Sequence, residues 1–202
     1  MTQSLFRWSV MLIMLDIFTS LSIPYLVDGS SLLQLYRYTN TIDTFRQMLF
    51  YHFTFYSRNY SVATSDLDFS VPLSWWRRIN NSKIFSDILL EKGFKKKRTF
   101  GEPDNFGYEE RWTKDNVDVD IFSSVVRAGV HSTGLWVEGE LYRCSYPLTG
   151  VRMVTVPMWG GREVRLQSPM EPVLVAMFGP NWRQPNNNWR WNVDPFLIGY
   201  CK

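Results

Sequence analysis

Two short segments of the chain combine the alternation of a β-strand with acidic side chains on one face. The first, residues 65–71, reads SDLDFSV, and the second, residues 115–122, reads DNVDVDIF. Because successive side chains of a strand point to opposite faces, the acids of each segment gather on one face and the apolar residues on the other. The acids that share a face are Asp66 and Asp68 in the first segment and Asp118 and Asp120 in the second. If the strands are neighbours, three or four carboxylates converge above a buried apolar surface.

Two interpretations of this acidic pattern stay open. A cluster of carboxylates repels itself unless a cation neutralises it, and Mg²⁺ or Mn²⁺ prefers carboxylate oxygens. Metal-assisted phosphoryl transfer uses such an arrangement. A half-buried strand with polar residues facing water alternates in the same way, and there Asp only keeps an edge soluble. Asp is a poor strand former, however, so two Asp-x-Asp strands in a chain of this length are unusual.

The composition is that of one folded domain. The chain has 202 residues, of which 45% are hydrophobic, 16% aromatic and 20% charged. It is long enough to bury a core and too apolar for a disordered chain. The formal net charge of +3 is too small to indicate nucleic acid as the main partner. We find no internal repeat and no Pro/Gly/Ser linker, so we expect a single α+β domain over residues 1–202.

The periodicity of apolar residues indicates the secondary structure. The predicted helices are residues 5–20, 32–38, 74–93 and 169–179. The predicted strands are residues 23–27, the two acidic segments, and residues 94–99, 108–113, 135–141, 151–156 and 161–166. The Trp-rich tail, residues 180–202, is expected to pack back onto the domain, because large aromatics left in water would form an apolar patch.

Other residue types suggest little chemistry. Cys144 and Cys201 could form one disulfide, which the sequence does not decide. His52 and His131 lack Cys or Asp at metal-ligand spacing, so we expect packed or surface histidines. The apolar run at residues 10–15 is far shorter than the roughly 20 residues that a membrane span requires.

A Gly-Ser pair lies between the strand predicted at residues 23–27 and a predicted helix. Gly29 allows close approach of the backbone, and free N–H groups at a helix start attract phosphate. Ser30 is also an ordinary helix N-cap, so the pair is not decisive by itself. The order strand, Gly-Ser, helix, Asp-x-Asp strand and further acidic strand resembles the nucleotidyltransferase (polymerase β-like) fold, a mixed sheet flanked by helices. In that fold Gly-Ser holds the nucleotide phosphates and three carboxylates hold the metal.

Four blocks of the sequence resemble the LicD/fukutin family, in the same order. The segment LDIFTSLSIPYLVDGSSLLQLYR, residues 15–37, is similar to the family's opening helix and its Gly-Thr/Ser-Leu-Leu-Gly-x-x-Arg motif, with Gly29, Ser30 and Arg37 at the matching places. DLDFSV resembles the family's Asp-x-Asp strand. DNVDVDIF resembles its later x-Asp-Ile/Val-Phe strand, which assigns the third acid to Asp120. FGPNWRQPNNNWRW resembles its Tyr-Gly-x-x-Trp-x-x-Pro ending.

The resemblance implies a function. Members of the family transfer a phosphorylated alcohol, such as phosphocholine or ribitol 5-phosphate, from a CDP-activated donor to a glycan. Eukaryotic members are Golgi-associated, usually through an N-terminal membrane anchor. We therefore expect a metal-dependent phosphotransferase of glycoprotein glycosylation, in the Golgi lumen or associated with its membrane. By this resemblance Asp66, Asp68 and Asp120 are catalytic and hold Mg²⁺ or Mn²⁺, while Gly29, Ser30 and Arg37 bind the donor phosphate.

Three departures from the family keep alternatives open. No anchor precedes Leu5, residues 38–62 look like an insertion, and Ser70 stands where bacterial relatives often carry a further acid. These departures favour a non-catalytic luminal binding module that retains the fold. A structural Ca²⁺ site is a third alternative, although no loop offers the oxygen ligands it needs. Arg37 is equally open to a structural ion pair.

Overall fold

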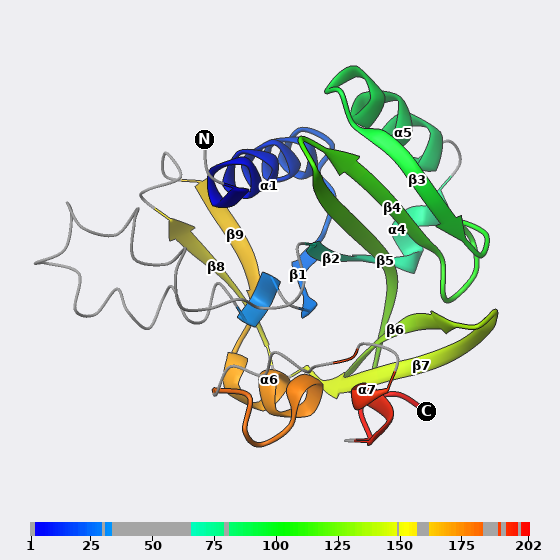
Figure 1. Cartoon of the computed structure of the whole chain (residues 1–202), viewed down its shortest axis with the longest axis vertical. Helices are drawn as coiled ribbons and strands as arrows, with labels where there is room; N and C mark the ends of the chain where they lie inside the picture. The colour runs from blue at the N-terminus through cyan, green and yellow to red at the C-terminus, as the bar shows by residue number, and fades with distance from the viewer. Residues whose placement is uncertain are drawn as a thin grey trace, which may run out of the picture.

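The chain adopts an α+β fold with a mixed, mostly antiparallel sheet and a few helices (Figure 1). The fold class expected from the sequence is confirmed at this level. This computed structural model describes residues 3–29, 31–33, 66–78, 81–148, 150–156, 162–183, 190, 193–197 and 199–202. The predictions that lie outside these residues are the insertion at 38–62, the helix beyond residue 33, and Ser30, Arg37 and His52.

The two acidic strands are neighbours within the main sheet. β2 (Leu67–Pro72) pairs in parallel with β5 (Val117–Arg127). On its other side β5 pairs antiparallel with β4 (Glu109–Lys114), and β3 (Lys95–Phe100) follows β4. The short β1 (Leu26–Val27) pairs antiparallel with β2. The resulting order, β1-β2-β5-β4-β3, places β2, β5 and β4 side by side.

A tight turn between β4 and β5 fixes the register of these two strands. Asp115 and Asn116 have φ values of 51° and 62°. A two-residue hairpin turn of type I′ requires this left-handed region at both central positions, and Asn and Asp tolerate it. The second acidic segment, predicted to be a strand from residue 115, therefore begins its strand at Val117. The same turn sets Arg111 opposite Asp120.

The helices α1 (Gln3–Ser20), α4 (Leu73–Trp76) and α5 (Asn81–Glu91) cover the apolar face of this sheet. Phe18 of α1 lies with its ring centroid 5.0 Å from that of Phe69 of β2 and 6.1 Å from that of Phe85 of α5. None of the described helices is long and apolar enough to cross a membrane. The apolar strand residues buried beneath these helices are Leu67, Phe69, Val71, Val117, Val119 and Ile121.

The single helix predicted at residues 74–93 is wrong, because the chain breaks into α4 and α5. The side-chain amide of Asn81 donates a hydrogen bond to the carbonyl of Trp75 (2.7 Å) and links the two helices across the break. In α5 the side chains of Phe85 and Leu89 are buried, whereas the apolar side chain of Ile84 is 46% exposed.

The second half of the chain consists mainly of hairpins. The end of β5 pairs with β6, and β6 pairs with β7 in the curved ribbon at the lower right of Figure 1. Residues 135–137 and 140–141 of the strand predicted at 135–141 are in strands, but the prediction of one continuous strand is wrong, because Glu138 and Gly139 have positive φ and form the turn between β6 and β7. The remaining elements are β6 (Val130–Val137), β7 (Glu140–Pro147), β8 (Val151–Val156), β9 (Arg162–Gln167), α6 (Met170–Phe178) and α7 (Asp194–Leu197).

Of the described residues after α6, Trp182 and Cys201 are buried against the domain, as the sequence predicts for this tail. The side chain of Trp182 is buried in the core, and Phe178 is partly buried against it. Trp189, another aromatic residue of the predicted tail, lies outside the described residues. Cys201 forms an antiparallel bridge with Cys144 of β7, which fastens the end of the chain to the β6–β7 ribbon.

Candidate functional site

The turn that carries Gly29 is attached to β2 at Asp68. The backbone N–H of Asp28 donates to the carbonyl of Asp68 (3.0 Å), and the N–H of Asp68 donates to the hydroxyl of Ser31 (2.9 Å). The N–H of Leu32 donates a hydrogen bond to the carbonyl of Asp28 (3.0 Å), which starts a helical turn. Gly29 has φ +50°, a value that L side chains rarely adopt. The expected phosphate turn thus lies directly beside the Asp-x-Asp strand.

The acids of β2 and β5 lie on the same face of the sheet, as period 2 predicts. Asp68 and Asp120 are register partners in the parallel pair, and Asp66 comes just before β2 begins. Asp66 and Asp68 are partly exposed, whereas the Asp120 side chain is only 3% exposed. Asp120 does not point into the apolar core: its two carboxylate oxygens are both bonded to Arg111. The face of the sheet opposite the helices therefore carries the candidate site.

Arg111 of β4 lies among these acids. Its Nε donates to Oδ1 of Asp120 (2.6 Å), and its Nη2 donates to Oδ2 of the same residue (2.5 Å). The same Nη2 lies 3.4 Å from Oδ2 of Asp66. Hydrogen bonds to Asp120 raise the pKa of Arg111, so its charge is fixed. A bidentate guanidinium–carboxylate pair with a third oxygen alongside is a strong and specific arrangement.

A fourth acid, Glu109, joins the cluster from β4. Glu109 is two residues before Arg111 in the strand and is 6% exposed. Burial raises its pKa to about 8, and the charges of Asp120 and Asp68 add to this while Arg111 opposes it. Burial likewise raises the pKa of Asp120 to about 7, against the hydrogen bond from Arg111. In the described part of this face, several acidic side chains therefore lie around the guanidinium of Arg111.

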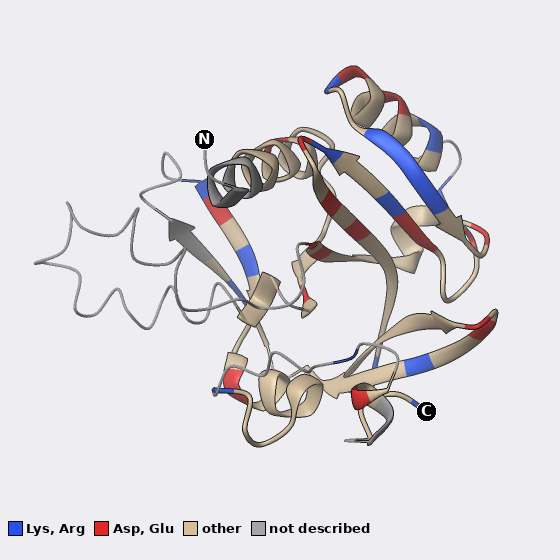
Figure 2. Ribbon diagram, in the orientation of Figure 1, with Lys and Arg blue, Asp and Glu red and all other residues tan. Residues whose placement is uncertain are grey.

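Asp118 occupies the same face but has a different partner. Lys97 of β3 bonds to both of its oxygens, at 2.6 Å and 2.9 Å. Figure 2 shows these charges as acidic bands on β5 beside β4 and the largely basic β3. The alternation alone does not distinguish Asp118 from Asp120, but their positions in the structure do. Asp120 lies toward β2 and the turn that carries Gly29, whereas Asp118 is paired with Lys97 of β3.

A buried polar cluster around Asp28 also supports the turn that carries Gly29. Oδ1 of Asp28 accepts the N–H of Gly29 (3.0 Å), and the hydroxyl of Tyr146 donates to the same carboxylate (3.3 Å). Ser70, which follows Asp68 on the same face of β2, bonds to Nε2 of His131 (3.1 Å). Burial raises the pKa of Asp28 to about 6 and lowers that of His131 to about 4. His131 is packed, as the sequence predicts, and Ser70 is part of this support rather than of the exposed acidic face.

The donor set of the acidic face fits a hard divalent cation in its chemistry, because it consists of carboxylates on adjacent strands of a partly open face. The sequence-based assignment of Asp66, Asp68 and Asp120 to one metal ion predicts that their carboxylates lie within one coordination shell. In the described part of the chain, however, no three His, Cys, Asp or Glu side chains are placed so that they could hold a metal ion. The arrangement seen is a carboxylate–guanidinium cluster centred on Arg111.

The sequence interpretation missed Arg111 and Glu109, although a signal for both was present. The strand predicted at residues 108–113 alternates, so that Glu109 and Arg111 share a face opposite Trp112. An Asp-Asn pair follows it and favours a two-residue hairpin turn. Counting outward from that turn would have placed Arg111 opposite Asp120, as the structure has it.

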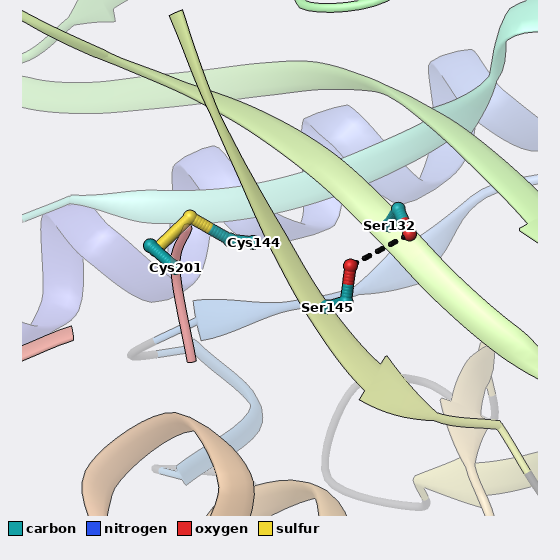
Figure 3. Close-up of a disulfide and its surroundings, with 4 residues drawn as sticks. All are labelled: Ser132, Cys144, Ser145 and Cys201. Carbon is teal, nitrogen blue, oxygen red and sulfur yellow. Dashed lines mark hydrogen bonds between the residues drawn. A yellow bond between two sulfur atoms is a disulfide. The ribbon is translucent and has the colours of Figure 1, made fainter. Parts of the chain in front are cut away.

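A disulfide joins Cys144 and Cys201 (Figure 3). Cys144 is two residues before Tyr146, a member of the buried polar cluster. Cys144 lies on β7, next to Ser145, whose hydroxyl bonds to that of Ser132 on β6 (2.8 Å). The backbone of Tyr200 accepts the N–H of Ser145 (2.9 Å), so the disulfide and the bridge around it hold the end of the chain on β7. The pairing that the sequence left open is formed.

Comparison with protein-family models gives no match for this chain, and comparison with curated proteins gives no match either. The function therefore has to be inferred from the residues of the site and their chemistry.

Proposed function

We propose that this chain is a metal-dependent phosphotransferase of the LicD/fukutin kind, on a nucleotidyltransferase (polymerase β-like) fold. It moves a phosphorylated alcohol, ribitol phosphate-like or phosphocholine-like, from a CDP-activated donor to a glycan. The position of Asp68 carries the proposal. Its backbone holds the turn of Asp28 and Gly29, and its strand aligns it with Asp120. The turn suited to phosphate and the acids suited to a metal therefore meet at one residue.

Asp66, Asp68 and Asp120 are the residues that would hold Mg²⁺ or Mn²⁺. When bound, the ion supplies Lewis-acid neutralisation of the donor diphosphate. Gly29 brings the backbone of the turn against Asp68, because a side chain at this position would meet the Asp68 carboxylate, and the donor phosphate would bind beside both. Ser30 and Arg37 are proposed as further phosphate ligands on the family resemblance alone.

The chain's own groups position the reactants and move one proton. The acceptor hydroxyl oxygen forms a bond to the phosphorus of the alcohol phosphate. The bond from that phosphorus to the bridging oxygen of the diphosphate breaks, and CMP leaves. A carboxylate oxygen of the acidic face accepts the hydroxyl proton, within hydrogen-bond reach of the acceptor. The partly exposed Asp66 and Asp68 are on the side of the cluster that an acceptor can reach.

We propose the Golgi lumen, or association with its membrane, as the location. The disulfide between Cys144 and Cys201 supports an oxidising compartment, because such bonds persist in the secretory pathway and are rare in the cytosol. Glycan acceptors are found in the same compartment, so the two parts of the proposal are consistent with each other.

The test is incubation with a panel of CDP-alcohols, a glycan acceptor and Mn²⁺, with release of CMP as the readout. We expect one donor to give CMP release that requires both metal and acceptor. Asp68→Asn should abolish this release, because it removes a charged ligand without changing volume. Asp118→Asn is the matched control, because Asp118 lies on the same face but pairs with Lys97.

A second candidate function is a non-catalytic luminal binding module. It is favoured by Ser70, which is 1% exposed and bonded to His131 where an additional metal-ligating acid would stand. Metal-dependent CDP binding in calorimetry, without CMP release from any donor, would support this candidate. Tight Ca²⁺ binding without nucleotide would instead support a structural calcium site.

A further inference from the structure

Arg111 occupies both oxygens of the most deeply buried acid of the proposed metal site. The two hydrogen bonds from Arg111 to Asp120 take up Oδ1 and Oδ2, at 2.6 Å and 2.5 Å. A divalent cation ligated by Asp120 needs at least one of these oxygens. It would also lie close to a fixed positive charge, because Arg111 cannot release its proton. The guanidinium and the ion therefore compete for the same carboxylate.

The arrangement leaves Arg111 room to give way. Its side chain is 33% exposed, and its second contact, to Asp66, is long at 3.4 Å with an acid that is itself 23% exposed. The guanidinium lies on the acidic face of the sheet, whereas Trp112, the next residue, points to the opposite face and is fully buried. Arg111 can therefore leave Asp120 without disturbing the core.

We propose that Arg111 and a divalent metal ion are alternative occupants of the carboxylates of Asp66 and Asp120. The guanidinium neutralises these acids when the metal is absent and withdraws when the ion binds. This inference rests on the proposed function for the metal itself, and goes beyond it in assigning the residue that sets metal affinity.

The test compares Mn²⁺ binding, measured by calorimetry, in the wild-type protein and in Arg111→Gln, Arg111→Lys and Lys97→Gln. Lys97→Gln is the matched control, because it also removes one positive charge from this face but from the pair with Asp118. If the guanidinium and the ion compete with a coupling free energy of ordinary size, Arg111→Gln should bind Mn²⁺ at least about tenfold more tightly than the wild type. The Mn²⁺ affinity of Lys97→Gln should differ from that of the wild type by less than about threefold. Arg111→Lys keeps the positive charge but cannot form the bidentate pair with a carboxylate, so its affinity for Mn²⁺ should lie between those of the wild type and Arg111→Gln.

Thermal unfolding gives a second readout. Without metal, Arg111→Gln should melt at a lower temperature than the wild type, because the carboxylates lose their neutralising partner. Saturating Mn²⁺ should raise its melting temperature by more than it raises that of the wild type. A third measurement needs no variant: in NMR spectra of the wild type, saturating Mg²⁺ should shift the Arg111 Nε–H resonance and speed its exchange with water.

The outcomes separate this inference from the proposed function. If the wild type binds Mn²⁺ but Arg111→Gln binds it no more tightly than Lys97→Gln, or if Mg²⁺ leaves the Arg111 resonance unchanged, the competition is refuted and the proposed function stands. If Arg111→Gln binds Mn²⁺ and the wild type does not, the competition is upheld and the native chain is the non-catalytic module. If none of the proteins binds Mn²⁺, both proposals are refuted.

Discussion

Gly29 lies so close to Asp68 that a β-carbon at position 29 would come within 2.5 Å of Asp68 Oδ2. Only glycine fits at this position, because it combines positive φ with contact against a carboxylate of the acidic face. The turn and the Asp-x-Asp strand are thus in direct contact, and a change in one displaces the other.

Gly29→Ala should destabilise the protein and disturb the site together. An alanine with left-handed backbone costs roughly 1–2 kcal/mol, and the clash with Asp68 adds to that. Gly139→Ala is the matched control, because Gly139 also has positive φ but a β-carbon there meets nothing within 4 Å. Urea unfolding should therefore show the larger loss in Gly29→Ala, and Mn²⁺ binding should weaken only in that variant. Equal losses in the two variants would mean that the contact with Asp68 does not matter.

Asp120→Asn should abolish phosphotransfer, whereas Asp118→Asn should leave most of it. Asp120 is buried beside Arg111 and aligned with Asp68, while Asp118 forms a more exposed pair with Lys97. Such surface pairs contribute roughly 0–1 kcal/mol, so Asp118→Asn should also change stability little. CMP release and urea unfolding of the two variants measure both effects. Equal losses of transfer would show that the assignment of the third acid to Asp120 is mistaken.

His131 should make the stability of the protein fall in acid. Its pKa is about 4 in the folded state because of burial, against about 6.5 in the unfolded chain. Between these values the unfolded state binds more protons, so the stability that His131 contributes is complete above pH 6.5 and is lost as the pH falls toward 4. A shift of this size corresponds to roughly 3 kcal/mol at its limit.

The neighbours of His131 decide how this effect must be measured. It bonds to Ser70 and stacks on Tyr146, and both of these bond to Asp28, whose pKa is raised to about 6. Because the pKa of Asp28 is raised, its protonation stabilises the folded protein as the pH falls, and in the wild type this opposes the loss of stability caused by His131. The difference in unfolding free energy between the wild type and His131→Gln cancels the Asp28 contribution, and this difference should fall between pH 7.5 and 4.5. A difference that stays constant would contradict the assigned pKa.

Removing the disulfide should destabilise the fold through the chain after α6. Cys144 and Cys201 close a loop with a sequence separation of 57, and the chain-entropy account predicts a loss of about 4 kcal/mol for a loop of that length. We expect Cys144→Ser/Cys201→Ser to lose roughly 2–4 kcal/mol in urea unfolding under oxidising conditions. Reduction of the wild type should give a similar loss. A loss well under 1 kcal/mol would show that the backbone bonds of Arg143 with Lys202 hold the tail without the disulfide.

The faces of the acidic strands could be predicted from the sequence because they depend only on the two-residue period. That rule placed Asp68 and Asp120 on one face and Phe69 and Ile121 on the other, and the structure agrees. The two-residue period alone does not give the partner of each acid, because the partner depends on the register between strands, which has to be counted from the turns. Arg111 meets Asp120 only because the turn at residues 115–116 has two residues, and a turn one residue longer would change the register.

The sequence held one signal for the break between α4 and α5, the polar run Asn80-Asn81-Ser82, but the apolar pattern on both sides of it favoured a single helix. No Gly or Pro interrupts residues 73–91, so the pattern of apolar residues predicted a continuous helix. The structure ends α4 at Trp76, which packs against Tyr108 and Phe85. The packing of Trp76 against these residues therefore outweighed the local helix propensity. Such packing cannot be read from a single sequence.

The parallel pairing of β2 with β5 leads us to expect that the site is completed late in folding. The β4–β5 hairpin joins neighbouring segments, so it can form early and already brings Arg111 to Asp120. Leu67 meets Val119 only after a long stretch of chain has closed, and closure of that kind is slow. We therefore expect Asp68 and its turn to join a hairpin in which Arg111 already faces Asp120. When β2 then covers Asp120, the charge of that acid is buried together with its guanidinium partner rather than alone.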